Sequence, residues 1–71
     1  MRADDLDELH WDVIEILREG RATPNYLSER TGESRALVSQ RLRDLQIRGS
    51  VNKVSRGLYE LVPEEVPDED E

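Results

Sequence analysis

The sequence predicts one small, mainly α-helical domain in which three helices are followed by a two-stranded β-hairpin. Apolar residues recur at helical spacing in three segments, which are separated by Gly20 and Gly32. After Gly49 the apolar period changes to two residues, which is typical of strands. The chain has 71 residues and no cysteine. It is therefore long enough for one domain, which must rely on its apolar core or on a partner subunit for stability.

The first helix is predicted over residues 4–19. Its apolar residues recur at steps of three and four, as in a helix that buries one stripe: Leu6, Leu9, Val13, Ile16 and Leu17. Asp4 and Asp5 favour its start through the helix dipole, and Gly20 can end it in a left-handed conformation.

Three residues of this helix need a separate interpretation. Trp11 and Ile14 lie on a face next to the apolar stripe, where they either widen the core contact or form a dimer seam. His10 is the only histidine, and no other soft ligand lies near it in the sequence. We expect it at the surface or at the boundary of the core, and not as a metal ligand.

Two further helices are predicted with a short turn between them. Thr23-Pro24 is a typical helix start, and this second helix runs to about Thr31, with Tyr26 and Leu27 as its apolar contacts. Gly32 stops it, and Ser34 caps a third helix over about residues 34–48. On the third helix Val38, Leu42 and Leu45 line one face. A turn of three or four residues that contains glycine is expected in a helix-turn-helix.

The hairpin is predicted from two β-prone runs, residues 51–55 and 58–62, which flank the turn dipeptide Arg56-Gly57. Tyr59 and Leu61 share a face and are expected to close the core, with Val54 on the opposite face. The remaining segment, residues 63–71, is acidic and punctuated by proline, so we expect it to be a disordered tail. The predicted folded domain is thus residues 1–62.

The net charge of −7 at first argues against a nucleic-acid partner, because phosphates are neutralised by Lys and Arg. The charges are unevenly distributed, however. Residues 1–20 carry a net charge of −5, residues 21–57 carry +5, and residues 58–71 carry −7. The middle of the chain is therefore basic. Nine of the ten bases are arginine, and this composition resembles that of proteins from salt-loving archaea, although a mesophilic protein with an acidic tail would also fit.

The order of the elements is that of a winged helix, and the chain resembles the small haloarchaeal winged helix-turn-helix regulators, relatives of MarR-type and phage-repressor-like proteins. The resemblance covers roughly residues 12–62. It is carried by Asp12-Val13-Ile14, Gly20-Arg21-Ala22-Thr23-Pro24, Tyr26-Leu27-Ser28-Glu29-Arg30-Thr31-Gly32, Val38-Ser39-Gln40-Arg41-Leu42-Arg43 and Arg56-Gly57-Leu58-Tyr59-Glu60-Leu61. It implies that the third helix enters the major groove of duplex DNA and that the hairpin, the wing, touches the backbone or the minor groove.

The residues of the third helix fit this implication. If its apolar stripe faces inward, the opposite side carries residue types that read base edges. The candidates for base reading are Arg35, Ala36, Ser39, Gln40 and Arg43. The candidates for phosphate contact, at helix starts and in the wing, are Asn25, Tyr26, Ser34, Lys53 and Arg56. Polar residues opposite an apolar stripe are also what any solvated helix displays, and Tyr26 could equally be buried.

Two residues of the third helix do not belong to this set. Arg41 lies on its flank, and we expect it to pair with an acid of the first or second helix. Ile47 stands where the family has a polar residue, so it either tucks under the hairpin or serves a partner contact.

Other classes of function find no support in the sequence. A cysteine nucleophile, a metal-ligand cluster and a glycine-rich phosphate loop are all missing, so we expect neither an enzyme nor a cofactor, a metal or a small-molecule ligand. No segment is typical of a signal peptide or a membrane span, which predicts a cytoplasmic protein.

Duplex DNA is the expected partner, bound by a homodimer formed through the first helix or the C-terminal segment. A rival hypothesis is a winged-helix module that binds proteins, in which Arg35, Arg43, Lys53 and Arg56 would be scattered or paired with acids. A DNA mimic built on the acidic ends is a third, weaker hypothesis.

Overall fold

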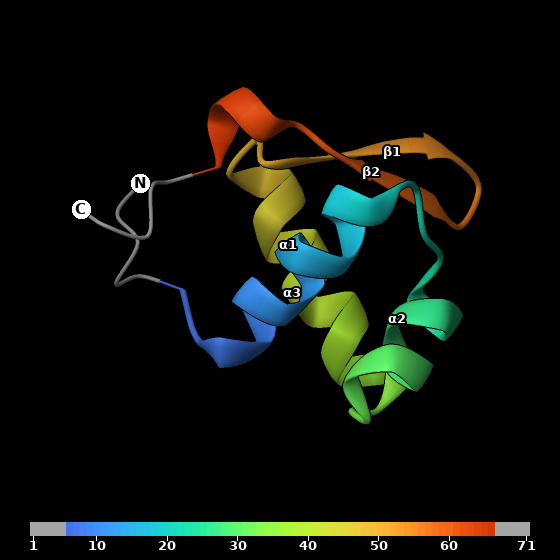
Figure 1. Ribbon diagram of the computed structural model, residues 1–71. Coiled ribbons are helices and arrows are strands. Elements are labelled where there is room, and N and C mark those ends of the chain that lie inside the picture. Colours follow the sequence, from blue (N-terminus) through green and yellow to red (C-terminus); the bar gives the residue numbers. More distant parts are fainter. Residues whose placement is uncertain (1–5, 67–71) are drawn as a thin grey trace.

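A computed structural model describes residues 6–66. It contains three α-helices, an antiparallel hairpin and a terminal 3₁₀ turn (Figure 1). The helices are α1 (Glu8–Glu19), α2 (Pro24–Thr31) and α3 (Arg35–Ile47), the strands are β1 (Val51–Ser55) and β2 (Leu58–Leu61), and the 3₁₀ turn is η2 (Pro63–Glu65). The predicted order of three helices and a hairpin is therefore confirmed.

The core lies between the three helices and the inner side of the hairpin, with α1 packed across α3 (Figure 1). It contains the apolar stripes predicted for the first and third helices. Its buried members are Leu6, Leu9, Val13, Ile14, Ile16, Leu17, Ala22, Leu27, Val38, Leu42, Leu45 and Val51. Ile14 is fully buried, and Trp11 packs against this core. The face of α1 that carries these two residues therefore widens the core contact, which was one of the two interpretations.

The start of α1 differs from the prediction. The helix begins at Glu8 and not at residue 4, because Asp7 caps it. The Asp7 side chain accepts a hydrogen bond from the His10 backbone amide, while the Asp7 backbone amide donates to Nδ1 of His10, both at 3.0 Å. This reciprocal pair satisfies amides that the first helical turn leaves free. Asp4 and Asp5, to which the helix start was assigned, lie outside the described residues.

His10 is buried, at 7% exposure, so of the two places expected for it, the surface and the boundary of the core, the surface is excluded. Both of its ring nitrogens have polar partners, since Nδ1 accepts from Asp7 and Nε2 lies 2.7 Å from Oδ2 of Asp44 on α3. A buried imidazole is tolerated where its polar atoms are satisfied, so this contact offsets the cost of burying it.

The turn between α2 and α3 has the predicted caps. Thr23 accepts from the backbone amide of Tyr26, and Ser34 accepts from that of Leu37. Gly32 ends α2 in the left-handed conformation, with φ of 77°. The hydroxyl of Ser28 donates to the carbonyl of Glu33 at 2.6 Å, which ties α2 to the turn. These local bonds hold α3 at a fixed angle to α2.

The hairpin pairs Val51 with Leu61 and Lys53 with Tyr59, in antiparallel register. The register shifts between Lys53 and Ser55, so Val54 lies at a bulge and is exposed, as predicted for the outer face. On the inner face, Tyr59 and Leu61 pack against the core. The hairpin therefore leans on the helices, as a two-stranded sheet must in water.

A further backbone contact joins the hairpin to the segment between α1 and α2. Ala22 and Tyr59 exchange two backbone hydrogen bonds, of 3.0 and 2.9 Å. Sequence patterns did not predict this bridge, because a single residue has no periodicity. It connects the outer edge of β2 directly to the residue that precedes the cap of α2.

The segment after β2 is partly packed, contrary to the prediction of a tail that cannot pack from residue 63 onward. Pro63–Glu65 form η2, and Val66 packs against the core. The hydroxyl of buried Ser50 donates to the Glu65 carbonyl at 2.9 Å, which anchors this turn beside the start of β1. The rest of the predicted tail, residues 67–71, lies outside the described residues.

Candidate nucleic-acid interface

The outward side of α3 carries the five residues predicted to read bases. Val38, Leu42 and Leu45 are buried, which fixes the inward side of the helix. Because side chains on a helix advance by about 100° per residue, the opposite side then faces solvent. The exposed residues on it include Arg35, Ala36, Ser39, Gln40 and Arg43. No other element of residues 6–66 covers them, so the side is accessible to a groove of DNA.

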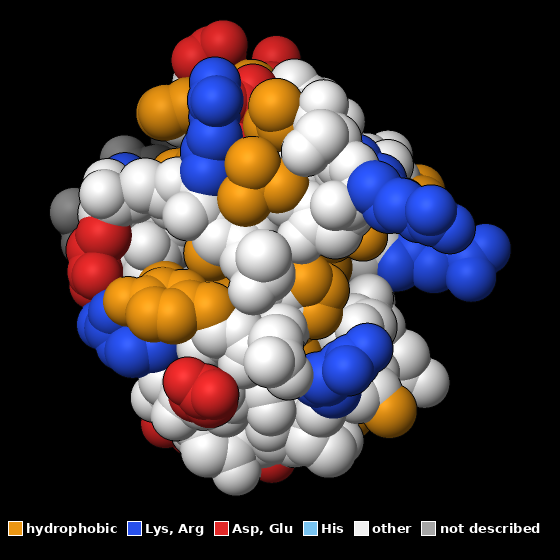
Figure 2. Space-filling model, turned by 90° about the vertical axis from the view of Figure 1, so that its right-hand side faces the viewer, with side chains coloured by type: hydrophobic (Ala, Val, Ile, Leu, Met, Phe, Trp, Pro, Cys, Tyr) orange, Lys and Arg blue, Asp and Glu red, His pale blue; other side chains and the backbone are white. Residues whose placement is uncertain are grey.

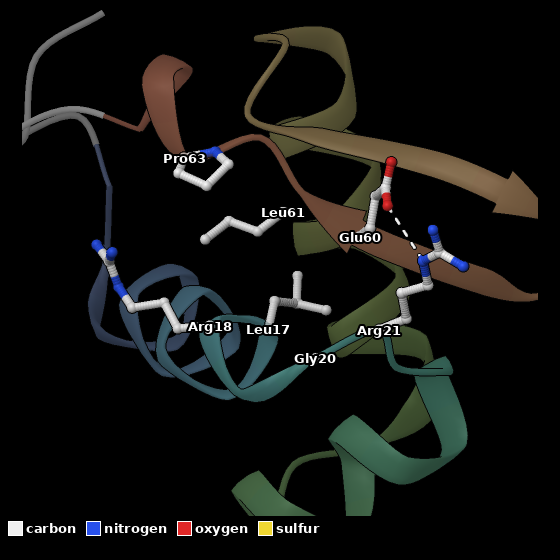
Figure 3. Close-up of a pocket in the computed structure, with 7 residues that line it drawn as sticks. All are labelled: Leu17, Arg18, Gly20, Arg21, Glu60, Leu61 and Pro63. Atoms are coloured by element: carbon white, nitrogen blue, oxygen red, sulfur yellow. Dashed lines mark hydrogen bonds and ion pairs between the residues drawn. The ribbon is translucent and has the colours of Figure 1, made fainter.

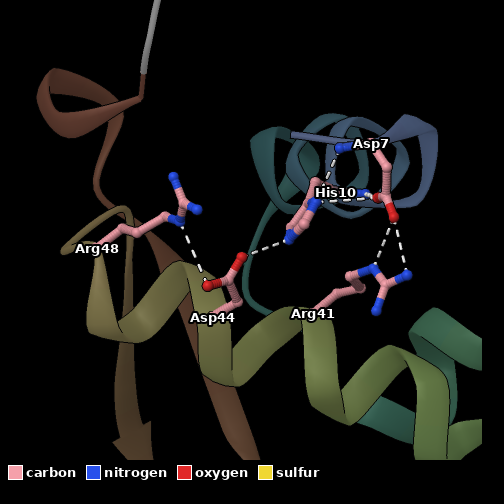
Figure 4. Close-up of polar contacts among 5 residues, drawn as sticks. All are labelled: Asp7, His10, Arg41, Asp44 and Arg48. Atoms are coloured by element: carbon pink, nitrogen blue, oxygen red, sulfur yellow. Dashed lines mark hydrogen bonds and ion pairs between the residues drawn. The ribbon is translucent and has the colours of Figure 1, made fainter. Parts of the chain in front are cut away.

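Polar contacts between α1 and α3 set the rotation of α3 (Figure 4). Arg41 reaches Asp7 with N–O distances of 2.8 and 2.9 Å, and one turn later Asp44 meets His10 at 2.7 Å. Arg48 also pairs with Asp44, at 3.3 Å. The prediction that Arg41 pairs with an acid at the first helix is thus confirmed. These contacts lie on the flank of α3, so its outward side stays clear of them.

The two acids of this cluster have lowered pKa values. Burial would raise the pKa of Asp7, but hydrogen bonds from the His10 amide and the Arg41 guanidinium outweigh it, so the pKa lies below its ordinary value. Burial likewise opposes a lowering for Asp44, while hydrogen bonds from Arg48 and His10 lower its pKa. Both carboxylates are accordingly charged at neutral pH, when they hold the basic flank of α3.

The basic residues of the described chain fall into two groups. Five arginines lie within 4.0 Å of a carboxylate: Arg18, Arg21, Arg30, Arg41 and Arg48. The other four bases of residues 6–66 have no carboxylate of those residues at that distance, and they are Arg35, Arg43, Lys53 and Arg56. In Figure 2, blue side chains project from the right-hand side of the face with no red ones among them; other blue side chains lie at the top and left beside red ones, and red ones also lie in the lower part of the face.

The wing supplies two of these four basic residues. Lys53 is exposed on β1, and Arg56 is exposed at the turn between the strands. Gly57 completes this turn with φ of 75°, a conformation that glycine adopts without strain. Long cationic side chains on a projecting turn suit contacts to phosphate or a narrow minor groove.

The candidates at helix starts are placed differently from one another. Asn25 is exposed in the first turn of α2, and Ser34 is exposed while its oxygen caps α3. Tyr26 is 42% exposed, but its hydroxyl already accepts from Arg30 at 2.6 Å. Arg30 in turn binds Glu19 through both terminal nitrogens, at 2.9 Å each, and its guanidinium carbon lies 5.5 Å from the centre of the Tyr26 ring. Tyr26 thus belongs with the ion pair between Glu19 on α1 and Arg30 on α2, and not with the basic residues that have no carboxylate partner.

Comparison with known proteins agrees with this geometry. The profile of the family described as winged helix-turn-helix DNA-binding matches residues 6–49, more than half of the chain. The chain belongs to this winged helix-turn-helix family. No curated protein and no solved structure matches it. The matched residues contain all three helices, and the hairpin that follows them completes the winged helix.

The winged helix also has an open groove away from α3. It measures about 400 Å³, and its apolar floor of Leu17, Leu61 and Pro63 lies between Arg18 and Arg21 (Figure 3). Arg21 pairs with Glu60 at 3.1 Å, and Arg18 pairs with Glu15 at 3.0 Å. Both arginines are paired with acids, and no lining residue belongs to α3. This groove is therefore separate from the four basic residues that have no carboxylate partner.

Within residues 6–66, no group of three or more His, Asp or Glu side chains is arranged to hold a metal ion. In the same part of the chain, no helix is both long and apolar enough to cross a bilayer.

Proposed function

We propose that this winged helix is a transcription regulator that binds duplex DNA in a sequence-specific manner. In this proposal α3 lies in the major groove and the wing contacts the backbone or the minor groove. Arg43 grips guanine, Gln40 pairs with adenine, Ser39 bonds to either base, and Ala36 meets a thymine methyl. Arg35 completes the base-reading set. Asn25, Ser34, Lys53 and Arg56 contact phosphates, and Tyr26 donates its hydroxyl proton to one, since that hydroxyl only accepts in its bond with Arg30.

The observation that carries the proposal is the selective pairing of the arginines. The chain is strongly acidic, yet Arg35, Arg43, Lys53 and Arg56 have no carboxylate partner among residues 6–66. Cations that bind phosphate or guanine must be available for those partners, since an internal ion pair would have to break first. The same four residues would be scattered or paired with acids in a module that binds proteins, so the rival hypothesis is not favoured.

We further propose that two copies bind a repeated half-site. One winged helix reads only a few base pairs, and a second copy supplies the missing affinity and sets the spacing of the half-sites. The two copies would meet through α1 or the C-terminal segment. Because Ile14 is buried in the core, an α1 contact would use the half-buried Trp11 and its exposed neighbours. The MarR-type and haloarchaeal relationship, the cytoplasmic location and the absence of catalysis stay predictions.

Selection of duplexes from a random library at several salt concentrations tests the proposal. The Kd of wild type for a selected duplex and for a random duplex is then compared with that of Arg43→Ala. We expect this variant to lose most of its preference for the selected duplex, a loss of about 5-fold to 100-fold in that ratio. Arg18→Ala is the matched control, since Arg18 is exposed but paired with Glu15. Equal losses on both duplexes for Arg43→Ala would refute the assignment of α3.

A further inference from the structure

Ile47 at the end of α3 is the most exposed large hydrophobic side chain of residues 6–66, at 77%. The sequence left two roles open for it, and the structure excludes that of a residue tucked under the hairpin. The other exposed large hydrophobics of this part of the chain are Tyr26 and Val54, at 42% and 40%. Tyr26 lies against Arg30, whereas Ile47 has little cover within the chain, so its side chain is free to contact a partner.

The position of Ile47 on α3 relates it to the base-reading residues. At about 100° per residue, Ala36, Gln40, Arg43 and Ile47 fall within an arc of about 60°. Ile47 therefore continues the outward stripe by one more turn beyond Arg43. It lies about 16 Å along the helix from Ala36, at roughly 1.5 Å per residue. It is also followed within four residues by β1, which carries Lys53. In the sequence, Ile47 thus stands between the basic residues of α3 and those of the wing that have no carboxylate partner.

The chemistry of DNA offers one apolar group to such a side chain. In the major groove, the C5-methyl of thymine is the feature that an aliphatic side chain can recognise. A branched aliphatic side chain without any polar atom cannot bond to phosphate or to the polar base edges. Its contact with a methyl group also differs from the arginine contacts in that salt does not screen it.

We propose that Ile47 is a specificity-determining residue that contacts a thymine methyl at the outer end of the site read by α3. This inference rests on the proposed DNA binding. It adds a thymine to the base preference of Ala36, Gln40 and Arg43, and that preference persists at high salt.

The test replaces each thymine of a selected duplex in turn by deoxyuridine, which removes the 5-methyl group and keeps the base pairing. At one outer position we expect the substitution to weaken binding of wild type about fourfold, the effect of one buried methyl group. For Ile47→Ala the same substitution should change nothing. Gln46→Ala is the matched control, because Gln46 is the exposed neighbour on the flank and should keep the wild-type response.

Other outcomes overturn the inference. If wild type and Ile47→Ala respond alike to deoxyuridine at every position, or if selected sites carry no thymine at the outer end, Ile47 does not read a methyl group. If instead Ile47→Ala changes the mass of the complex or of the free protein, Ile47 contacts a second copy of the chain. Failure of wild type to prefer any duplex would refute the proposed function itself, which distinguishes the two failures.

Discussion

The Nε2 atom of His10 lies 2.7 Å from Oδ2 of Asp44, which joins the first turn of α1 to the middle of α3. Nδ1 of the same ring lies 3.0 Å from the Asp7 backbone amide and 2.9 Å from Oδ1 of Asp7, so the imidazole is held between two aspartates. The neighbouring residue, Arg43, projects from the outward side of the same helix. A contact made for packing thus also determines where Arg43, which we propose to read a base, points.

We expect His10→Ala to lower the free energy of unfolding by about 1–3 kcal/mol, the cost of leaving buried polar partners without a hydrogen bond. Urea denaturation at pH 7 measures it, with the slope of the transition unchanged. Glu15→Gln is the control, because it breaks only the exposed pair with Arg18 and should cost less than about 0.5 kcal/mol. Equal effects of the two substitutions would contradict a stabilising role for the buried contact.

The lowered pKa of Asp7 predicts a pH dependence of stability. A carboxyl whose pKa is lower in the folded state stabilises the fold above its unfolded pKa, and the contribution is lost as the pH falls through the folded value. Asp7→Asn keeps an oxygen that can cap α1 but removes the charge. Wild type should therefore be more stable than Asp7→Asn at pH 6 by about 1 kcal/mol or less, since the side chain is half-exposed.

This difference should shrink as the pH falls from about 4 toward 2, where Asp7 becomes protonated in wild type. Thermal unfolding of both proteins across this range measures it. Asp12→Asn serves for comparison, because Asp12 is exposed and has no ion pair within residues 6–66. A gap between wild type and Asp7→Asn that stays constant down to pH 2 would argue against the ion pair with Arg41.

Lys53→Ala should weaken binding to all duplexes alike and reduce the slope of log Kd against log salt by about one. The reason is that a phosphate contact releases counterions and carries no base information. Arg21→Ala is the matched control, since Arg21 is also exposed but pairs with Glu60 on the same sheet as Lys53. If both variants changed the slope equally, basic side chains with and without a carboxylate partner would not differ in their contribution to binding.

The helices and the hairpin could be predicted because their signals are local. Caps such as Thr23 and Ser34, and glycines such as Gly32, mark helix ends whatever the tertiary structure. The start of α1 could not be placed, because several acids precede it. Two contacts select Asp7 as the cap: the ion pair with Arg41, which is distant in the sequence, and the reciprocal hydrogen bonds with His10.

The candidate site was predicted only in part, for a similar reason. Exposure of Arg43 and Gln40 follows from helical period alone. Whether an arginine is paired depends on acids brought near by the fold, and the chain has 17 of them. His10 could have been recognised as buried, since it lies between Leu6 and Val13 at helical spacing. The aspartate on α3 that makes its burial tolerable lies 34 residues away in the sequence.

Because five arginines are neutralised within the fold, the remaining positive charge affects how the protein orients as it approaches a polyanion such as DNA. The net charge of the chain is −7, whereas the four basic residues of 6–66 that have no carboxylate partner lie on α3 and the wing, so positive charge is concentrated there. In dilute buffer, the field of DNA exerts a torque that turns this side toward the duplex before contact. At about 1 M salt, where the screening length is about 3 Å, that orienting force disappears. Association should then slow, because productive encounters depend on rotational diffusion alone.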